Sequence, residues 1–122
     1  MAQGVWDGAF VRGAPSIARA VRGLASEATG ALAVLAPTAR DGDLLVKAQS
    51  KAHGAFRRAL RAGKAQGALS ARILHGTGRI PAGSPMVVVA AAARSRRDAL
   101  VAVELMLNGL KGVAVRRDAS KA

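Results

Sequence analysis

The sequence predicts an α+β fold in which helices pack on a mixed, mostly antiparallel β-sheet. Apolar residues recur at helical spacing in three segments, and short runs of valine, leucine and alanine mark six extended segments. The two kinds of segment follow one another in the order β-α-β-β-α-β-β-α-β, with glycine or proline at most boundaries. The 122 residues are expected to form one domain, 1–122, long enough to bury a core.

The first half of the chain is expected to form a strand, a helix and two further strands. A short edge strand covers Val5–Val11, and a helix capped by Ser16 ends at Thr29-Gly30. The apolar positions of this helix recur at helical spacing at Ile17, Val21, Leu24 and Ala25. Ala31–Ala36 is predicted to be a buried strand, and Leu44–Gln49 a further strand.

The second half is built around two strands joined by a glycine-rich turn. An amphipathic helix is expected at Ala52–Gln66, followed by a strand at Ala71–His75 and a very apolar strand at Pro85–Ala93. The turn between these strands carries Gly76, Gly78, Pro81 and Gly83. A third helix starts within residues 94–97 and continues to about Leu110. A last strand at Val113–Val115 then opens a basic segment, 113–122, which is expected to be a frayed tail.

The composition points to an anionic partner and to help from another subunit. Half of the residues are apolar, but they are mainly alanine, valine and leucine, with two Phe, one Trp and no Tyr. A core of such small side chains gains little packing energy per residue, so a partner subunit is expected to add stability. The net charge is +12, and eleven Lys or Arg but no acid lie between Asp43 and Asp98.

The sequence also indicates where the protein works and which chemistries it lacks. It has no cysteine, so disulfides, thiolate metal sites and thiol nucleophiles are excluded. The N-terminus does not resemble a signal peptide, and the longest apolar run, Met86–Ala93, is far shorter than the ~20 residues of a membrane span. A cytoplasmic protein without a membrane segment is therefore expected. No metal-ligand cluster and no phosphate-binding glycine loop is present, so no cofactor is expected.

Cations at the two ends of the third helix are the best functional candidates. Arg96 and Arg97 occupy its first turn, where the helix dipole disfavours positive charge by a few tenths to ~1 kcal/mol. They either extend into solvent or meet an anion such as a phosphate or carboxylate. Ser95 with Asp98 fits a capping box at this end. Lys111 follows the last turn, where a cation is favourable even without a function.

The remaining candidates are individually ambiguous. Arg40 lies in a polar loop, PTARDGD, as either a solvated residue or a phosphate clamp, and His75 is either a hydrogen-bonded core residue or part of a site. A stripe formed by Arg57, Arg61 and Lys64 is typical of a solvated helix face. It could bind nucleic acid, but no aromatic residue is interleaved with it for base stacking, so nucleic acid is an unlikely partner.

Several of these residues fall in a pattern that resembles a known family. The runs HGTGRIPAG and VVVAAAARSRRDAL and the later Leu-Lys pair are similar to the catalytic (large) subunit of molybdopterin synthase. The matched positions are His75, Gly78, Gly83, Arg96, Ala99, Leu110 and Lys111, with Gly30, Arg40 and Asp41 in the upstream stretch GALAVLAPTARDGD. The similarity spans roughly Ser16 to Asp118 in the correct order.

The resemblance implies a fold, a reaction and partners. The family has an α/β-hammerhead fold, forms a homodimer, and acts in molybdenum cofactor biosynthesis by converting cyclic pyranopterin monophosphate to molybdopterin. Its sulfur comes from a thiocarboxylate on the C-terminal tail of a small ubiquitin-like subunit, and the two kinds of subunit form a heterotetramer. By this resemblance Arg40 and Arg96 bind the substrate phosphate with His75 in the same site, and Lys111 is catalytic in the sulfur transfer.

The chain departs from the family pattern at several positions. Ser95 replaces the His of the family's His-Arg pair, and Val115, Arg117 and Asp118 replace the Pro, Trp and Lys of its Pro-x-Trp-Lys segment. Arg116 and Arg117 are then auxiliary cations that would support Lys111. Two alternatives stay open: an impaired relative that binds a protein tail or an anion, and, from charge alone, a basic nucleic-acid-binding domain.

The spacing along the third helix adds a prediction about assembly. Arg96 and Lys111 are fifteen residues apart, or about 22 Å along a helix, so they cannot contact one small substrate from the same chain. A shared site therefore requires Arg96 from a second copy, and a homodimer with composite sites is expected.

Overall fold

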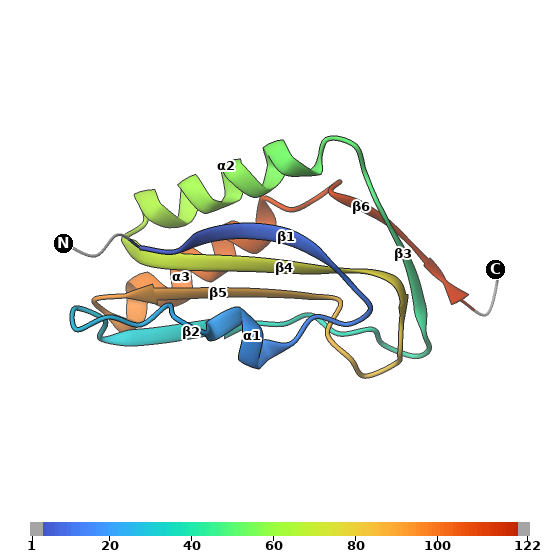
Figure 1. Ribbon diagram of the computed structural model, residues 1–122, viewed down its shortest axis with the longest axis horizontal. Helices are drawn as coiled ribbons and strands as arrows, with labels where there is room; N and C mark the ends of the chain where they lie inside the picture. Colours follow the sequence, from blue (N-terminus) through green and yellow to red (C-terminus); the bar gives the residue numbers. More distant parts are fainter. Residues whose placement is uncertain (1–3, 120–122) are drawn as a thin grey trace.

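The computed structural model describes residues 4–119, which form a six-stranded sheet and three helices (Figure 1). The order of elements along the chain is the one expected from the sequence. The elements are β1 (Trp6–Arg12), α1 (Ile17–Val21), β2 (Ala31–Leu35), β3 (Leu44–Ala48), α2 (Ala52–Ala65), β4 (Ala68–Ile80), β5 (Val87–Ala93), α3 (Arg96–Asn108) and β6 (Ala114–Asp118).

The sheet is mixed and mostly antiparallel, as predicted. Its strand order is β2-β5-β4-β3-β6, and β1 pairs with β4 off this path. Only the β1–β4 pair is parallel among the pairings of the described strands. The long strand β4 organises the sheet, because its first part pairs with β1 and β5 while its last residues pair with β3.

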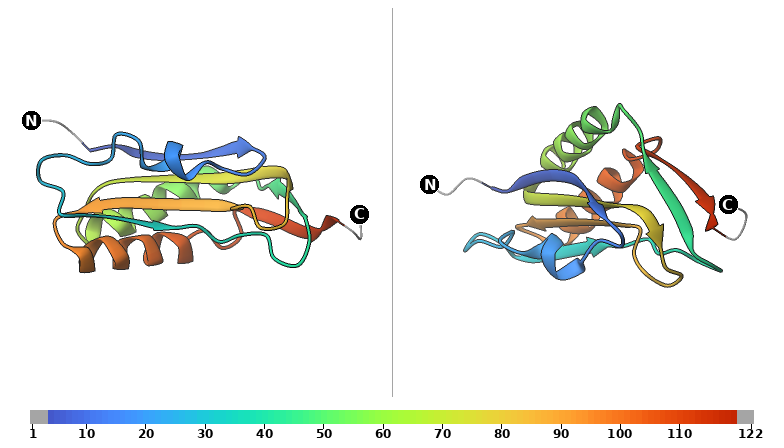
Figure 2. Two further views of the ribbon diagram at one scale, coloured as in Figure 1. Left: turned by 90° about the horizontal axis from the view of Figure 1, so that it is seen from below. Right: turned by 45° about the vertical axis from the view of Figure 1, so that its right-hand side comes forward.

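The helices cover the two faces of the sheet unequally. The larger core cluster joins α2 and α3 to one face, and a smaller cluster joins α1 to the other face through Ala20, Leu24 and the alanines of β5. Figure 2 shows α1 and α3 on opposite sides of the strands. Since β5 is covered on both faces, all seven of its residues are buried, which explains its unbroken apolar sequence VVVAAAA.

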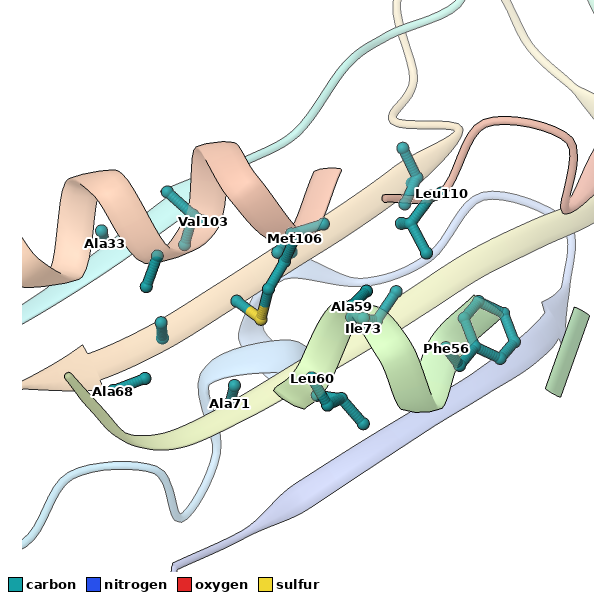
Figure 3. Packing of buried hydrophobic residues seen from close by; sticks show 14 of the residues in the cluster. Ala33, Phe56, Ala59, Leu60, Ala68, Ala71, Ile73, Val103, Met106 and Leu110 are labelled. Carbon is teal, nitrogen blue, oxygen red and sulfur yellow. The ribbon is translucent and has the colours of Figure 1, made fainter. Parts of the chain in front are cut away.

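Small side chains let the two long helices approach each other closely. A Cβ atom at Gly63 of α2 would lie only 2.7 Å from the Sδ of Met106, which is fully buried on α3. Figure 3 shows Met106 extending between the two helices, with Ala59 and Leu60 of α2 nearby. The unbranched methionine fills the space that these small residues leave.

Two elements in the first half differ from expectation. The helix after Ser16 is a single turn that ends at Val21, because Gly23 adopts φ +74° and Arg72 of β4 donates hydrogen bonds to three carbonyls of residues 19–22. The Ser16 cap itself is confirmed, since its hydroxyl accepts from the Arg19 N–H. Strand β2 was expected to be buried, but it is the last strand of the sheet and only Ala33 is buried.

Two elements in the second half are longer than expected. Strand β4 continues through Gly76 and Gly78 to Ile80, so the turn is confined to the segment before β5. The frayed tail predicted for residues 113–122 is wrong for residues 114–118, which form β6 and pair with β3. Residues 120–122 lie outside the part of the chain that the structure describes.

Candidate functional site

Three residues singled out from the sequence, His75, Lys111 and Arg116, line one cavity of about 260 Å³. We call it the Lys111 cavity. It lies where the end of α3 meets the loop after β2, the middle of β4 and the starts of β5 and β6. Its lining residues are Pro37, His75, Met86, Val87, Leu107, Asn108, Leu110, Lys111, Gly112, Val113, Ala114 and Arg116.

The end of α3 fixes the position of Lys111. Leu110 and Val113 on either side of it are buried in the main core cluster, while Lys111 itself is exposed. Gly112 adopts φ +85°, a conformation that favours glycine, and it turns the chain from α3 toward β6. The lysine is therefore held between two buried anchors with its ammonium group free to meet a ligand at the cavity.

His75 supplies a neutral imidazole to the cavity wall. The residue is only 5% exposed, and its ring packs edge-on against Phe10 with 5.5 Å between ring centroids. Its Nδ1 lies 2.9 Å from the carbonyl oxygen of Gly76, so in the neutral ring Nδ1–H donates and Nε2 keeps a lone pair. Burial lowers the pKa of His75 below its usual value, an effect only partly offset by the Gly76 hydrogen bond, and the charge of Arg116 lowers it further.

Arg116 reaches the cavity from β6. Its Nη1 lies 3.2 Å from the Sδ of Met86, which also lines the cavity. Side chains alternate along a strand, so Arg117 lies on the other face, where it lines a separate hollow with Leu45 and Lys47. Of the two auxiliary cations considered from the sequence, Arg116 alone lines the cavity with Lys111.

Two cations beside a neutral imidazole make the cavity suited to an anion. Lys111 and Arg116 offer ammonium and guanidinium donors to phosphate or carboxylate oxygens, and the Arg116 fork can bind two of them at once. Leu107, Leu110 and Val113 give the same cavity an apolar side. A ligand that combines a negative group with an apolar or planar body fits this lining.

Arg40 lies on a well-anchored loop but is not a lining residue of the cavity. The Ala39 N–H donates a hydrogen bond to the carbonyl oxygen of Ser84, and the Ala39 carbonyl oxygen accepts one from the Gly83 N–H. The Arg40 side chain is 88% exposed, and its Nε lies 3.7 Å from Oδ2 of the neighbouring Asp41. The loop starts at the cavity wall, because Pro37 lines the cavity three residues earlier.

Arg96 lies at the opposite end of α3 from Lys111. It is exposed in the first helical turn, beside the Ser95 cap. The Ser95 hydroxyl accepts a hydrogen bond from the Asp98 N–H, which confirms the capping role predicted for Ser95. Within one chain the structure thus brings together His75, Lys111 and Arg116, and it leaves Arg40, Arg96 and Arg117 outside this cavity.

Sequence reasoning missed two features of the surface. Asn108 lines the cavity, and its position at the end of the predicted helix, three residues before Lys111, was a usable indication. The basic stripe on α2 does have an aromatic neighbour, because Trp6 of β1 lies under Lys64, with Nζ 5.5 Å from the ring centroid. The expectation that no aromatic side chain accompanies the stripe is therefore wrong. The sequence did not reveal this neighbour because Trp6 lies on β1, far from α2 along the chain.

Comparison with known proteins identifies the family. Residues 13–113 match the model of a family described as MoaE protein. The chain belongs to the MoaE family. This match covers both the loop with Arg40 and the whole of α3 through Lys111, as expected from the resemblance to molybdopterin synthase large subunits. A comparison with individually curated proteins gives no significant sequence match.

Solved structures of MoaE and molybdopterin synthase share the fold. A molybdopterin synthase structure from Staphylococcus aureus is 18% identical, with TM-score 0.72, covering 88% of this chain and 85% of that one. A complex of subunits 1 and 2 of molybdopterin-converting factor from Helicobacter pylori is 17% identical, with TM-score 0.75 and coverage of 91% and 83%. A MoaE protein from Burkholderia ambifaria is 21% identical, with TM-score 0.65 and coverage of 92% and 80%. The predicted fold class is thereby confirmed.

Two further properties follow from the described part of the chain. None of the helices within residues 4–119 is long and apolar enough to cross a membrane. In the same residues, no group of three or more His, Asp or Glu side chains is arranged to hold a metal ion.

Proposed function

We propose that this MoaE-family chain, as one domain, is the large subunit of a molybdopterin synthase. Membership of the family supports a role in molybdenum cofactor biosynthesis. In this role the protein transfers sulfur from a thiocarboxylated small ubiquitin-like subunit to cyclic pyranopterin monophosphate. The observation that carries the proposal is the convergence of His75, Lys111 and Arg116 on one cavity, although they come from β4, the end of α3 and β6.

The cavity lining suits the two anions that meet in this reaction. A thiocarboxylate at the end of a protein tail is attracted to Lys111. Once its sulfur has bonded to the pterin, water cleaves the acyl–sulfur bond and leaves a carboxylate on the tail and the sulfur on the pterin, and the Lys111 ammonium group can stabilise the negative charge that develops on the acyl oxygen. His75 is kept neutral by burial, so its Nε2 can accept a proton or a hydrogen bond from the pterin. Arg116 takes the place of the second cation that the family has at the position of Asp118.

The substrate phosphate is assigned to Arg40 and Arg96. Arg40 follows the cavity wall at Pro37 on a loop whose backbone is tied to the turn before β5. Arg96 is about 22 Å from Lys111 along α3 and therefore joins the site only from a second copy of the chain. The active unit is accordingly a homodimer that carries one small subunit per site. The Helicobacter pylori complex of subunits 1 and 2 supports a small-subunit partner.

Reconstitution with a thiocarboxylated small subunit and cyclic pyranopterin monophosphate tests the proposal. Wild-type protein is expected to form the dithiolene product, and Lys111→Ala to lower kcat by about 100-fold, as for loss of a positioned proton donor. Arg116→Ala is expected to raise KM, because it removes a binding cation. Arg117→Ala is the matched control: it removes the same charge one residue away, outside the cavity, and is expected to leave both constants unchanged.

Two outcomes would contradict the proposal. If the wild-type protein binds the small-subunit tail but forms no product, the chain is an anion- or tail-binding relative and not an enzyme. If Lys111→Ala and Arg117→Ala behave alike, the cavity is not the place where sulfur is transferred.

A further inference from the structure

The outer face of α2 carries a row of cations that the Lys111 cavity does not use. We call this row the α2 basic face and define it by Arg57, Arg58, Arg61 and Lys64, all of which are exposed. None of the four lines the cavity. Figure 1 shows α2 on the outside of the molecule, next to β1. The net charge of +12 is far larger than one anion-binding cavity requires, so a separate role for this face is expected.

The cations of the α2 basic face repel one another, and nothing in the helix compensates for this repulsion. Arg57 and Arg61 are four residues apart, and Arg61 and Lys64 are three apart, so their side chains are neighbours on the helix surface. Like charges at this spacing destabilise a helix. Residues 44–97, which include all of α2, contain no acid. The ion pairs found within residues 4–119 all lie outside α2. An external anion that spans the row would remove this repulsion.

An aromatic side chain lies beside the row. Trp6 of β1 is half-buried, and Nζ of Lys64 lies 5.5 Å from the centroid of its ring. Trp6 and Leu60 form the apolar wall of a hollow of about 210 Å³, and Arg57, Arg61 and Lys64 line the rest of it. An aromatic wall framed by cations suits a planar ring that carries a negative group outside the hollow.

The surroundings of the α2 basic face favour a nucleic acid over a protein or a membrane. Protein interfaces have an apolar centre, but none of the large hydrophobic residues exposed within residues 4–119 lies on α2. A membrane-bound amphipathic helix inserts its apolar face, whereas the apolar face of α2 is buried in the main core cluster. Binding to a nucleic acid depends on phosphate contacts and base stacking, and this face offers groups for both.

We propose that the α2 basic face binds single-stranded nucleic acid, with phosphates on its four cations and one base in the hollow beside Trp6. Stacking on a side chain requires a base that is free of a partner strand, so a single strand fits better than a duplex. Arg57 and Lys64 are about 10 Å apart along α2, so the face contacts only a few nucleotides. The sequence argued against nucleic acid because the stripe lacks an interleaved aromatic residue, and Trp6 supplies that residue from β1.

Fluorescence anisotropy with a labelled 12-nucleotide oligo(dT) and the full chain, between 50 and 200 mM salt, tests the phosphate contacts. Four contacts predict a slope of about −3 when the logarithm of the association constant is plotted against that of the salt concentration. A double variant, Arg57→Gln with Arg61→Gln, should bind about 10-fold more weakly or worse, with a slope of about −1.5. Arg19→Gln with Arg22→Gln is the matched control, because it removes the same charge at α1, on the other face of the sheet. It should change the affinity by less than about 2-fold.

An abasic strand of the same length tests the stacked base. It offers the same phosphates, so the wild type should bind it about 10-fold more weakly than oligo(dT), as expected for the loss of one stacked base. Trp6→Leu should bind the two strands equally. Because Trp6 is the only tryptophan, oligo(dT) should also quench the intrinsic fluorescence of the wild type more than the abasic strand does.

Circular dichroism checks that each variant is folded, and if Trp6→Leu is not, the comparison of the two strands on the wild type decides. Equal weakening by the α2 and α1 double variants would overturn the site, because only the net charge would then attract the strand. Equal binding of both strands by the wild type would overturn the position of the base. Tighter binding of a poly-glutamate peptide, or of anionic lipid vesicles, would assign the face to a protein or a membrane instead. None of these measurements uses sulfur transfer, so their outcome is independent of the proposed function.

Discussion

The buried imidazole of His75 predicts a specific dependence of stability on pH. Burial lowers its pKa in the folded protein, whereas in the unfolded chain the group titrates near 6.5. Between these two values the unfolded chain binds one more proton than the folded protein. The free energy of unfolding therefore rises with pH in this window, and the stability that His75 contributes is lost as the pH falls below about 6.5.

The limiting size of the effect follows from one proton. A difference of one bound proton changes the free energy of unfolding by about 1.4 kcal/mol per pH unit, reached once the unfolded chain is fully protonated at this group. Replacing His75 with Gln removes this slope. The substitution also alters the contact with Phe10, but that shifts the stability at every pH by a similar amount and leaves the slope unaffected.

Urea denaturation at pH 5.0, 5.5, 6.0, 6.5 and 7.5, at one fixed protein concentration, measures the effect. His53→Gln is the matched control, since His53 is the other histidine of the chain and is exposed at the start of α2. The wild type and His53→Gln should lose stability in parallel below pH 6.5, and His75→Gln should lose clearly less. Equal slopes for all three proteins would show that His75 is protonated as easily in the folded state as in the unfolded one.

Three other predictions concern packing, capping and the basic helix face. Met106→Ala removes a fully buried side chain between α2 and α3 and should cost about 2–5 kcal/mol in urea denaturation; a loss well under 1 kcal/mol would contradict the close packing at Gly63. Ser95→Ala removes the hydroxyl that accepts the Asp98 N–H and should cost about 1 kcal/mol, which Ser95→Asp should largely restore. Lys64→Gln should alter the fluorescence of Trp6, the only tryptophan, while costing no more than about 1 kcal/mol; an unchanged emission spectrum would place the lysine away from the ring.

Local pattern was sufficient for the elements of the fold but not for their ends. The apolar run of β5 and the helical periodicity of α2 and α3 depend on burial within one segment, so they could be recognised from the sequence. The end of α1 depends on Arg72, about fifty residues later, whose guanidinium donates hydrogen bonds to the carbonyl oxygens of Arg19, Ala20 and Arg22 at the end of the helix. The extension of β4 beyond His75 depends on pairing first with β1 and then with β3, and a local sequence pattern does not reveal either pairing.

The candidate site was only partly predictable for the same reason. His75 and Lys111 could be proposed because their motifs resemble those of a family, and the cavity brings them together. The basic residues of the last strand could be proposed as substitutes for a missing lysine. The sequence did not predict which of them reaches the cavity. That choice depends on the face that each side chain of β6 occupies, and therefore on tertiary pairing.

The register of β6 is in this way part of the chemistry of the site. Val46 of β3 is buried and pairs with Arg116, and this pairing sets which residues of β6 face the cavity. A slip of one residue would turn Arg116 away and bring Arg117 to the cavity side, because side chains alternate along a strand. The guanidinium group beside Lys111 would then occupy a different position and would lose the contact that Arg116 makes with the Met86 sulfur. The pairing of β6 with β3, a strand that does not line the cavity, thus determines whether a second cation is available to the anion that Lys111 attracts.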